Sequence, residues 1–193
     1  MILSIFIRDT EFHISTEDKC EIYRIPEKHM MVDKIPYHLQ EFISKINIET
    51  INTILYPSCL CSFTTSRIID SIIKGLQISI HNLKLVMIIE FMPYINIIKE
   101  YKPSGCLATR TARNSYIICK YNKDSITCVS EYNCILGDII FCEDKVFAES
   151  NFATEQIKAY RNCSVEFSPF IYNNGASANL LPPLAYAYKN IEH

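Results

Sequence analysis

Residues 51–89 read INTILYPSCLCSFTTSRIIDSIIKGLQISIHNLKLVMII and contain the pattern that decides the fold. The run from Ile51 to Tyr56 is rich in β-branched and aromatic residues and stops at Pro57, which predicts a short buried strand. From Thr64 the apolar residues recur at helical spacing, and from Leu83 to Ile89 the chain is apolar again. The stretch therefore predicts a strand, a loop, a helix and a second strand.

The flanking segments predict further elements of a mixed α/β protein. Met1 to Ile25 predicts a strand, a turn near Thr16 to Asp18 and a second strand. Asp33 to Ile46 predicts a helix with Pro36 in its first turn, and Tyr94 to Lys99 predicts a short helix. Strands of a second lobe are predicted for residues 106–108, 116–121, 125–129 and 139–142, and the stretch from about 121 to 167 is predicted to be rich in strands.

Composition limits the classes of function. The net charge is -2 and the isoelectric point is near 6.2, so the chain is not expected to bind nucleic acid without a partner. The nine cysteines are an odd number and include no C-x-x-C pair, which favours buried or loop thiols over a zinc site. Met1 to Ile7 lacks a basic region and ends at Arg8-Asp9, so we expect a cytoplasmic protein. Charged and proline residues interrupt residues 83–98, and no membrane span is expected.

The helix that begins at Thr64 has a wide apolar face. Its apolar residues span an arc of about 140°, wider than the ~100° stripe that covers one sheet. One edge is therefore available to a second helix. The helix of Asp33 to Ile46 fills this edge in the simplest arrangement, and the pair still leaves an apolar seam for association. The candidate contact residues are Leu39, Phe42, Ile43, Ile69, Ile73 and Leu76.

The sequence predicts neither a catalytic residue nor a metal site. A metal site on a helix uses two histidines four residues apart, because that spacing places both imidazoles on one face. The five histidines include no such pair: His13, His29, His38, His81 and His193. A cysteine-histidine nucleophile stays open, because such partners meet in space rather than in sequence.

The loop before the Thr64 helix resembles a motif of the TsaB family. Residues 59–67 read CLCSFTTSR, and the family loop reads approximately G-P-G-S-F-T-G-L-R. The residues in common are Ser62, Phe63, Thr64 and Arg67, between the same strand and the same helix. Cys59, Cys61 and Thr65 stand where the family has glycine, and a Cβ there resists positive φ and close approach to a phosphate.

Three other segments resemble the same family. Residues 2–6 resemble its first strand, I-L-A-I-D, with Phe6 in place of the aspartate and with Asp9 nearby. Residues 111–116 resemble its segment D-A-R-x-G-E-V-Y and keep Arg113, and residues 181–188 resemble its closing P-x-Y-L-R. Arg67 and Arg113 could each bind a carboxylate or phosphate, or pair with a neighbouring acidic residue to fix a loop.

The resemblance implies an actin-like, ribonuclease-H-like fold of two small lobes, each with a mixed sheet and flanking helices. The linker candidate at residues 102–105 places a first lobe at residues 1–102 and a smaller one at residues 103–193. TsaB proteins are non-catalytic partners of the enzyme TsaD in making threonylcarbamoyladenosine on tRNA position 37. The resemblance therefore implies a scaffold subunit that contacts TsaD through its two helices.

Further partners follow from the resemblance. They are a TsaE-like ATPase and a second copy of the chain, with tRNA reached only indirectly. No cofactor of its own is implied, although ATP at a partner interface stays open. The alternative is a nucleotide-binding ATPase or phosphotransferase of the same superfamily. Phe6 and the lost glycines favour the scaffold, because they remove the groups that hold metal and phosphate.

Overall fold

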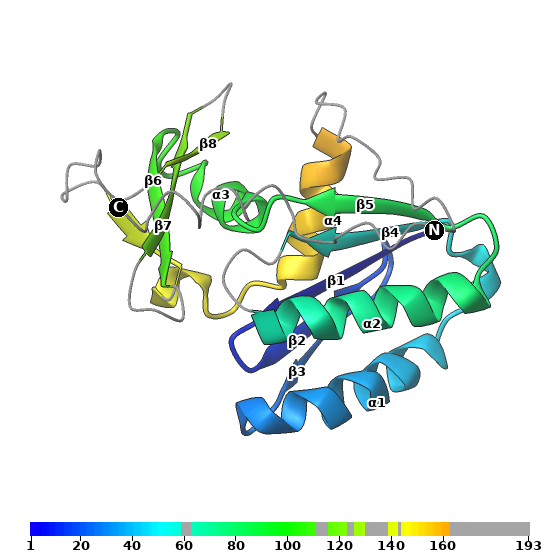
Figure 1. Cartoon of the computed structure of the whole chain (residues 1–193). Helices are drawn as coiled ribbons and strands as arrows, with labels where there is room; N and C mark the ends of the chain where they lie inside the picture. The colour runs from blue at the N-terminus through cyan, green and yellow to red at the C-terminus, as the bar shows by residue number, and fades with distance from the viewer. Residues whose placement is uncertain (59–62, 111–115, 123–125, 130–138, 143, 163–193) are drawn as a thin grey trace, which may run out of the picture.

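The computed structural model describes residues 1–58, 63–110, 116–122, 126–129, 139–142 and 144–162, which form two β-sheets and their covering helices (Figure 1). The first sheet, ordered β3-β2-β1-β4-β5, contains β1 (Ile2–Arg8), β2 (Glu11–Ser15), β3 (Cys20–Arg24), β4 (Thr53–Pro57) and β5 (Lys84–Ile88). The second sheet, ordered β8-β7-β6-β9, contains β6 (Gly105–Arg110), β7 (Tyr116–Tyr121), β8 (Ile126–Val129) and β9 (Ile139–Phe141). The α-helices within these residues are α1 (Met31–Ile43), α2 (Phe63–Ser79), α3 (Met92–Ile98) and α4 (Phe152–Asn162).

The two sheets repeat one strand arrangement. In the first sheet β1, β2 and β3 form an antiparallel meander, and β4 pairs with β1 in parallel. In the second sheet β6, β7 and β8 form the same meander, and β9 pairs with β6 in parallel. The predicted α/β architecture with two mixed sheets is therefore confirmed. The predicted strand, helix and strand of residues 51–89 are also confirmed, as β4, α2 and β5.

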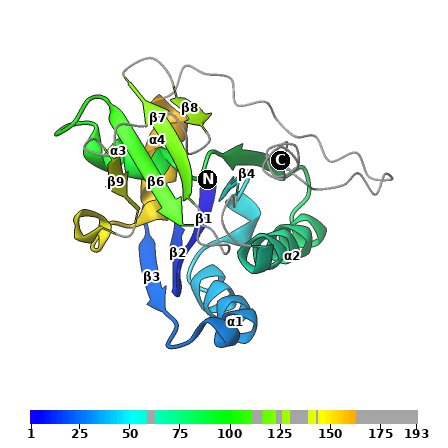
Figure 2. The same cartoon turned by 60° about the vertical axis from the view of Figure 1, so that its left-hand side comes forward.

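The first sheet has helices on both faces because successive side chains along its strands point to opposite faces, and both faces carry residues that pack against helices. Leu3, Ile5 and Ile7 of β1 point to one face, where they join the core beneath α1 and α2. Ser4 points to the other face and donates to Gln156 Oε1 of α4 at 2.7 Å. Figure 2 shows α1 and α2 side by side, apart from α3 and α4. Helices α1 and α2 therefore cover one face of the first sheet, and α4 covers the other.

Two predicted segments differ from the structure, the first strand and the helix of Asp33 to Ile46, which ends at Ile43 as α1. The first segment forms two strands instead of one, because the chain reverses at Asp9, whose φ is 50°. Helix α1 starts at Met31 rather than Asp33, because the 3-10 turn η1 (Lys28–Met30) runs directly into it. Pro36 consequently lies inside the helix rather than in its first turn, and it offers no N–H to the preceding turn.

The prediction of strands from about residue 121 to 167 is wrong in its last part, which contains α4. Asn151 Oδ1 accepts a hydrogen bond from the Thr154 N–H at 3.1 Å and begins the helix. Its buried residues recur at helical spacing: Phe152, Ala153, Gln156, Ile157 and Ala159. The four predicted strands of this half are confirmed as β6 to β9, and the short helix at residues 94–99 is confirmed as α3.

Helix α4 packs on the first sheet although it follows the second sheet in the chain. It contacts β1, β2 and β4, and it also packs against α3. Phe6 of β1, Tyr94 of α3, Leu107 of β6 and Phe152 of α4 belong to one buried cluster. The predicted division at residue 102 falls in the turn between α3 and β6, and this continuous core joins the two sheets across it.

Candidate functional site

A groove of about 640 Å³ lies between α1 and α2. We call it the helix groove. From α1 and the following 3-10 turn η2 (Ile48–Thr50) it is lined by Val32, Pro36, Leu39, Gln40, Ile43 and Ile48, and from α2 by Thr64, Arg67, Ile68, Ser71, Ile72, Gly75, Leu76 and Ser79. Val32, Ser71, Gly75 and Ser79 are exposed, so the helix groove opens to solvent.

The structure divides the six predicted contact residues into two sets. Leu39, Ile43 and Leu76 line the helix groove. Phe42, Ile69 and Ile73 do not line it and are buried in the core that covers the first sheet, to which Leu39 and Leu76 also belong. The division follows helical phase, because neighbouring residues on a helix are 100° apart and cannot all point the same way.

Small residues line one wall of the helix groove. Ser71, Gly75 and Ser79 follow one another at intervals of four along α2, so they share a face. A Cβ built on Gly75 meets nothing within 4 Å. The Ser71 and Ser79 hydroxyls donate to the Arg67 and Gly75 carbonyls at 2.8 and 3.1 Å. The hydrogen bonds of these hydroxyls are therefore satisfied within α2, and a segment that binds against this wall need not supply hydrogen-bonding partners for them.

The motif residues are only partly described. Ser62 and Arg113 lie outside the described residues, as does the closing segment at 181–188. Phe63 is the first residue of α2, and Thr64 and Arg67 line one end of the helix groove. The sequence pattern thus predicted the helix that carries the motif. It missed Val32 of α1 and Ser71, Gly75 and Ser79 of α2 as lining residues. The spacing of small residues was the available signal for the three on α2.

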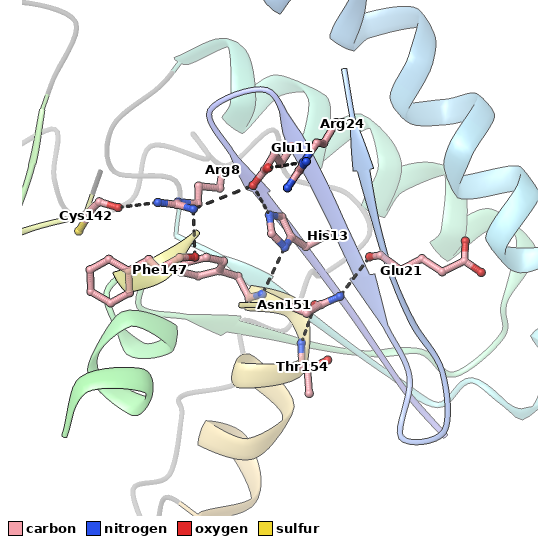
Figure 3. A network of polar contacts seen from close by, with 10 residues as sticks. Arg8, Glu11, His13, Glu21, Arg24, Cys142, Phe147, Asn151 and Thr154 are labelled. Carbon is pink, nitrogen blue, oxygen red and sulfur yellow. Dashed lines mark hydrogen bonds and ion pairs between the residues drawn. The ribbon is translucent and has the colours of Figure 1, made fainter. Parts of the chain in front are cut away.

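The sequence analysis also did not predict a polar network on the face of the first sheet opposite α1 and α2 (Figure 3). The Arg8 guanidinium donates to the carbonyls of Phe147 and Cys142, each at 3.1 Å. It also lies 4.0 Å from Glu11 Oε2 and 5.1 Å from the centre of the Phe152 ring. Arg8 therefore connects the end of β1 to segments that follow the second sheet.

His13 is buried in the same network. Its Nδ1 accepts the Phe152 N–H at 3.3 Å, which places the proton of the neutral ring on Nε2, 3.4 Å from Glu11 Oε2. Burial, together with the charge of Arg8, lowers the pKa of His13 to about 3. His13 is therefore neutral in the folded protein at ordinary pH. The signal in the sequence was the alternation of Glu11, His13 and Ser15 along one strand face.

Aromatic rings occupy the space beside Phe6. The Phe6 ring stacks on Phe152, with centroids 5.1 Å apart, and meets Tyr94 and His13 edge-on. Phe147 packs against Tyr94 with centroids 5.0 Å apart. Asp9 points elsewhere, because its Oδ1 pairs with Lys28 Nζ at 2.6 Å. The end of β1 is thus an apolar cluster bordered by Arg8.

No group of three or more His, Cys, Asp or Glu residues in the described part of the chain has an arrangement that could hold a metal ion. Within the same residues, no helix has the length and apolar character needed to cross a membrane.

Comparisons with known proteins identify the fold. No protein-family model and no curated protein matches the chain. Among solved structures it is similar to "YeaZ from Pseudomonas aeruginosa", with a TM-score of 0.56 and 10% identity over 69% of this chain and 70% of that one.

Two other solved structures are similar at lower TM-scores. One is an uncharacterized protein "with similarity to peptidase YEAZ from Pseudomonas aeruginosa", with a TM-score of 0.48 and 12% identity over 69% of this chain and 68% of that chain. The other is a putative N-acetylglucosamine kinase from Porphyromonas gingivalis, with a TM-score of 0.40 and 14% identity over 72% of this chain and 50% of that chain. The similarity to YeaZ, together with the repeated strand order, shows that this chain has the actin-like, ribonuclease-H-like fold of YeaZ.

Proposed function

We propose that this chain is a non-catalytic partner subunit that supports a TsaD-like enzyme in the threonylcarbamoyladenosine modification of tRNA position 37. The helix groove is the observation that carries this proposal. It lies on the face formed by α1 and α2, the two helices through which the resemblance to TsaB implies contact with the enzyme. The fold, shared with YeaZ, supports the same reading.

The lining of the helix groove fits an apolar helical segment of the enzyme. Its walls are mainly aliphatic, with Leu39 and Ile43 on α1 and Ile72 and Leu76 on α2. Gly75 lets a neighbouring backbone approach closely, because no side chain stands above it. Small residues at helical spacing and an aliphatic groove are the features that helix-in-groove recognition uses.

The end of β1 supports a non-catalytic role. Phe6 is 1% exposed and surrounded by rings, where a carboxylate would be needed near a metal-bound phosphate. Asp9, the nearest acidic residue in the sequence, is paired with Lys28. The chain would therefore contribute contacts rather than a reaction, with no cofactor of its own.

The proposal extends to the other partners. A second copy of the chain would use the same helix groove, so self-association and enzyme binding would exclude each other. The TsaE-like ATPase and any ATP would join through the enzyme. The net charge of -2 fits a subunit that reaches tRNA indirectly.

Reconstitution of the modification tests the role. The TsaD-like enzyme and the other components from the same genome are incubated with tRNA, with and without this chain, and modified adenosine is measured. We expect modification to require the chain and to fall with Val32→Glu, which places a charge in the helix groove. Modification that proceeds equally without the chain would refute the proposal.

A further inference from the structure

The segment after the second sheet returns to the first sheet and lies across one of its faces. It comprises the 3-10 turn η5 (Lys145–Phe147) and helix α4. We call residues 144–162 the latch. Figure 3 shows how the latch meets β1, β2 and β3 through polar side chains.

Polar contacts with the latch involve all three strands of the first meander, β1 to β3, and the turn between β2 and β3. From the end of β1 to its start they involve Arg8 with the Phe147 carbonyl, His13 with the Phe152 N–H, Asn151 with the Glu21 carbonyl, Ser15 with Thr154, Ser4 with Gln156 and Arg161 with Glu17. The distances between the hydrogen-bonding atoms are 2.7 to 3.3 Å. Such contacts fix the position of the latch, because each donor must meet its acceptor.

Arg8 makes the contacts at the junction with the second sheet. Its two terminal nitrogens donate to carbonyls on either side of the start of the latch, at Cys142 and Phe147. The charge also lies above Phe152, the first residue of α4. The Arg8 side chain is only 15% exposed, so these charge-assisted bonds are largely shielded from solvent.

The core on the other face of the sheet does not depend on the latch. All buried residues of that core lie between Leu3 and Leu85, on the first sheet, on α1 and α2 and in the turns between them. The latch contributes instead to the cluster around Phe6 and to a smaller one that contains Ile157 and Ala159. Release of the latch would therefore disrupt these two clusters and leave the first core closed.

We propose that the latch is a unit that opens while the first sheet, α1 and α2 stay folded, and that Arg8 holds it closed. Opening withdraws Phe147 and Phe152 from the cluster around Phe6 and leaves Tyr94 of α3 as a ring that still packs on Phe6. The fold thus contains a device that fixes the relative position of its two halves with the chain's own side chains. This inference does not rest on the proposed function, because the helix groove lies on the opposite face.

Native-state hydrogen exchange of the full chain tests the inference with Arg8→Met, which keeps the aliphatic stem and removes both donors. Arg24→Met is the matched control: Arg24 pairs with the same Glu11, at 3.1 Å, but is 79% exposed. We expect amides of α4 to exchange at least about tenfold faster in Arg8→Met, the size expected for lost charge-assisted bonds. Amides of β4 and α2 should keep their rates, and Arg24→Met should change neither.

Two results would overturn the inference. Unchanged α4 rates in Arg8→Met would show that Arg8 does not hold the latch. An equal increase in α4, β4 and α2 would show that Arg8 supports the whole fold and that the latch does not open separately. If Arg8→Met does not fold, Arg8→Lys is judged by the same rates, and failure of both variants to fold would also contradict an independent first core.

Discussion

Phe6 of β1 stacks on Phe152 of α4, with ring centroids 5.1 Å apart and an angle of 22° between the ring planes. The two side chains come from opposite ends of the described chain, and both are buried. Tyr94 and Phe147 pack beside them. The pair therefore places an aromatic core at the position where the TsaB strand that residues 2–6 resemble has an aspartate.

Phe6→Asp is expected to destabilise the fold strongly. The variant removes a buried ring, which alone costs about 3–5 kcal/mol, and adds a carboxyl group without a compensating hydrogen bond. Phe6→Leu keeps an apolar side chain and is expected to cost about 1–2 kcal/mol. Urea unfolding of both variants measures the difference. Equal stability of the two variants would mean that the cluster accepts a charge.

The lowered pKa of His13 predicts that the folded protein loses stability in acid. Burial lowers the pKa of His13 to about 3 in the folded protein from the 6.5 that is usual for histidine, so the unfolded chain binds more protons between these pH values. The contribution is full above pH 6.5 and declines as the pH falls, by up to ~1.4 kcal/mol per pH unit. Unfolding free energies measured at pH 7.5 and pH 5 give the slope.

His13→Gln is the control for this pH dependence. Glutamine can still accept the Phe152 N–H but does not titrate, so the slope below pH 6.5 should become shallower than in the natural chain. The charged neighbours Arg8 and Glu11 are retained in both proteins. The same slope in both proteins would show that His13 is not the source.

Gly75→Ala is expected to have opposite effects on folding and on binding. The new Cβ meets no atom within 4 Å, and alanine favours a helix interior by about 0.5–1 kcal/mol, so thermal unfolding of the free chain should shift upward. In the complex the same methyl group would lie between two helices that pack closely, and affinity should fall. Binding that stays unchanged would show that the partner does not approach Gly75.

Ile73→Asp and Ile78→Asp are expected to separate the core from the surface of α2. Ile73 is buried in the core, so a carboxylate there should prevent folding or lower the stability by several kcal/mol. Ile78 is 83% exposed, and its replacement should change stability by less than about 0.5 kcal/mol. Circular dichroism during urea unfolding measures both. A stable Ile73→Asp would contradict the burial.

Much of the fold could be predicted from local patterns. The strand, helix and strand of residues 51–89 have strong periodicities, and the four strands of the second half have polar turns between them. Helix α4 was missed, although Asn151 and the spacing of Phe152, Gln156 and Ile157 are helical signals. Its docking also depends on partners from β1 and β2, which lie far away in the sequence.

The candidate site was predictable only in outline. The wide apolar face of α2 indicated a helix contact, but the pattern alone could not separate Leu76, which lines the helix groove in addition to packing in the core, from Ile73, which packs in the core and does not line the groove. That separation depends on how α1 and α2 are placed on the sheet. The role of Arg8 was likewise not visible, because its acceptors are backbone carbonyls more than 130 residues away.

The central claim is that the helix groove binds a TsaD-like enzyme, and a matched pair of variants tests it most directly. Val32 lines the helix groove and is 57% exposed, whereas Ile78 is exposed on α2 and is not among the lining residues. Each is changed to Glu, and binding to the TsaD-like protein of the same genome is measured by titration calorimetry with light scattering. A stoichiometric complex that Val32→Glu weakens at least about tenfold and Ile78→Glu leaves intact is the predicted result. No complex, or equal binding by both variants, would contradict the account.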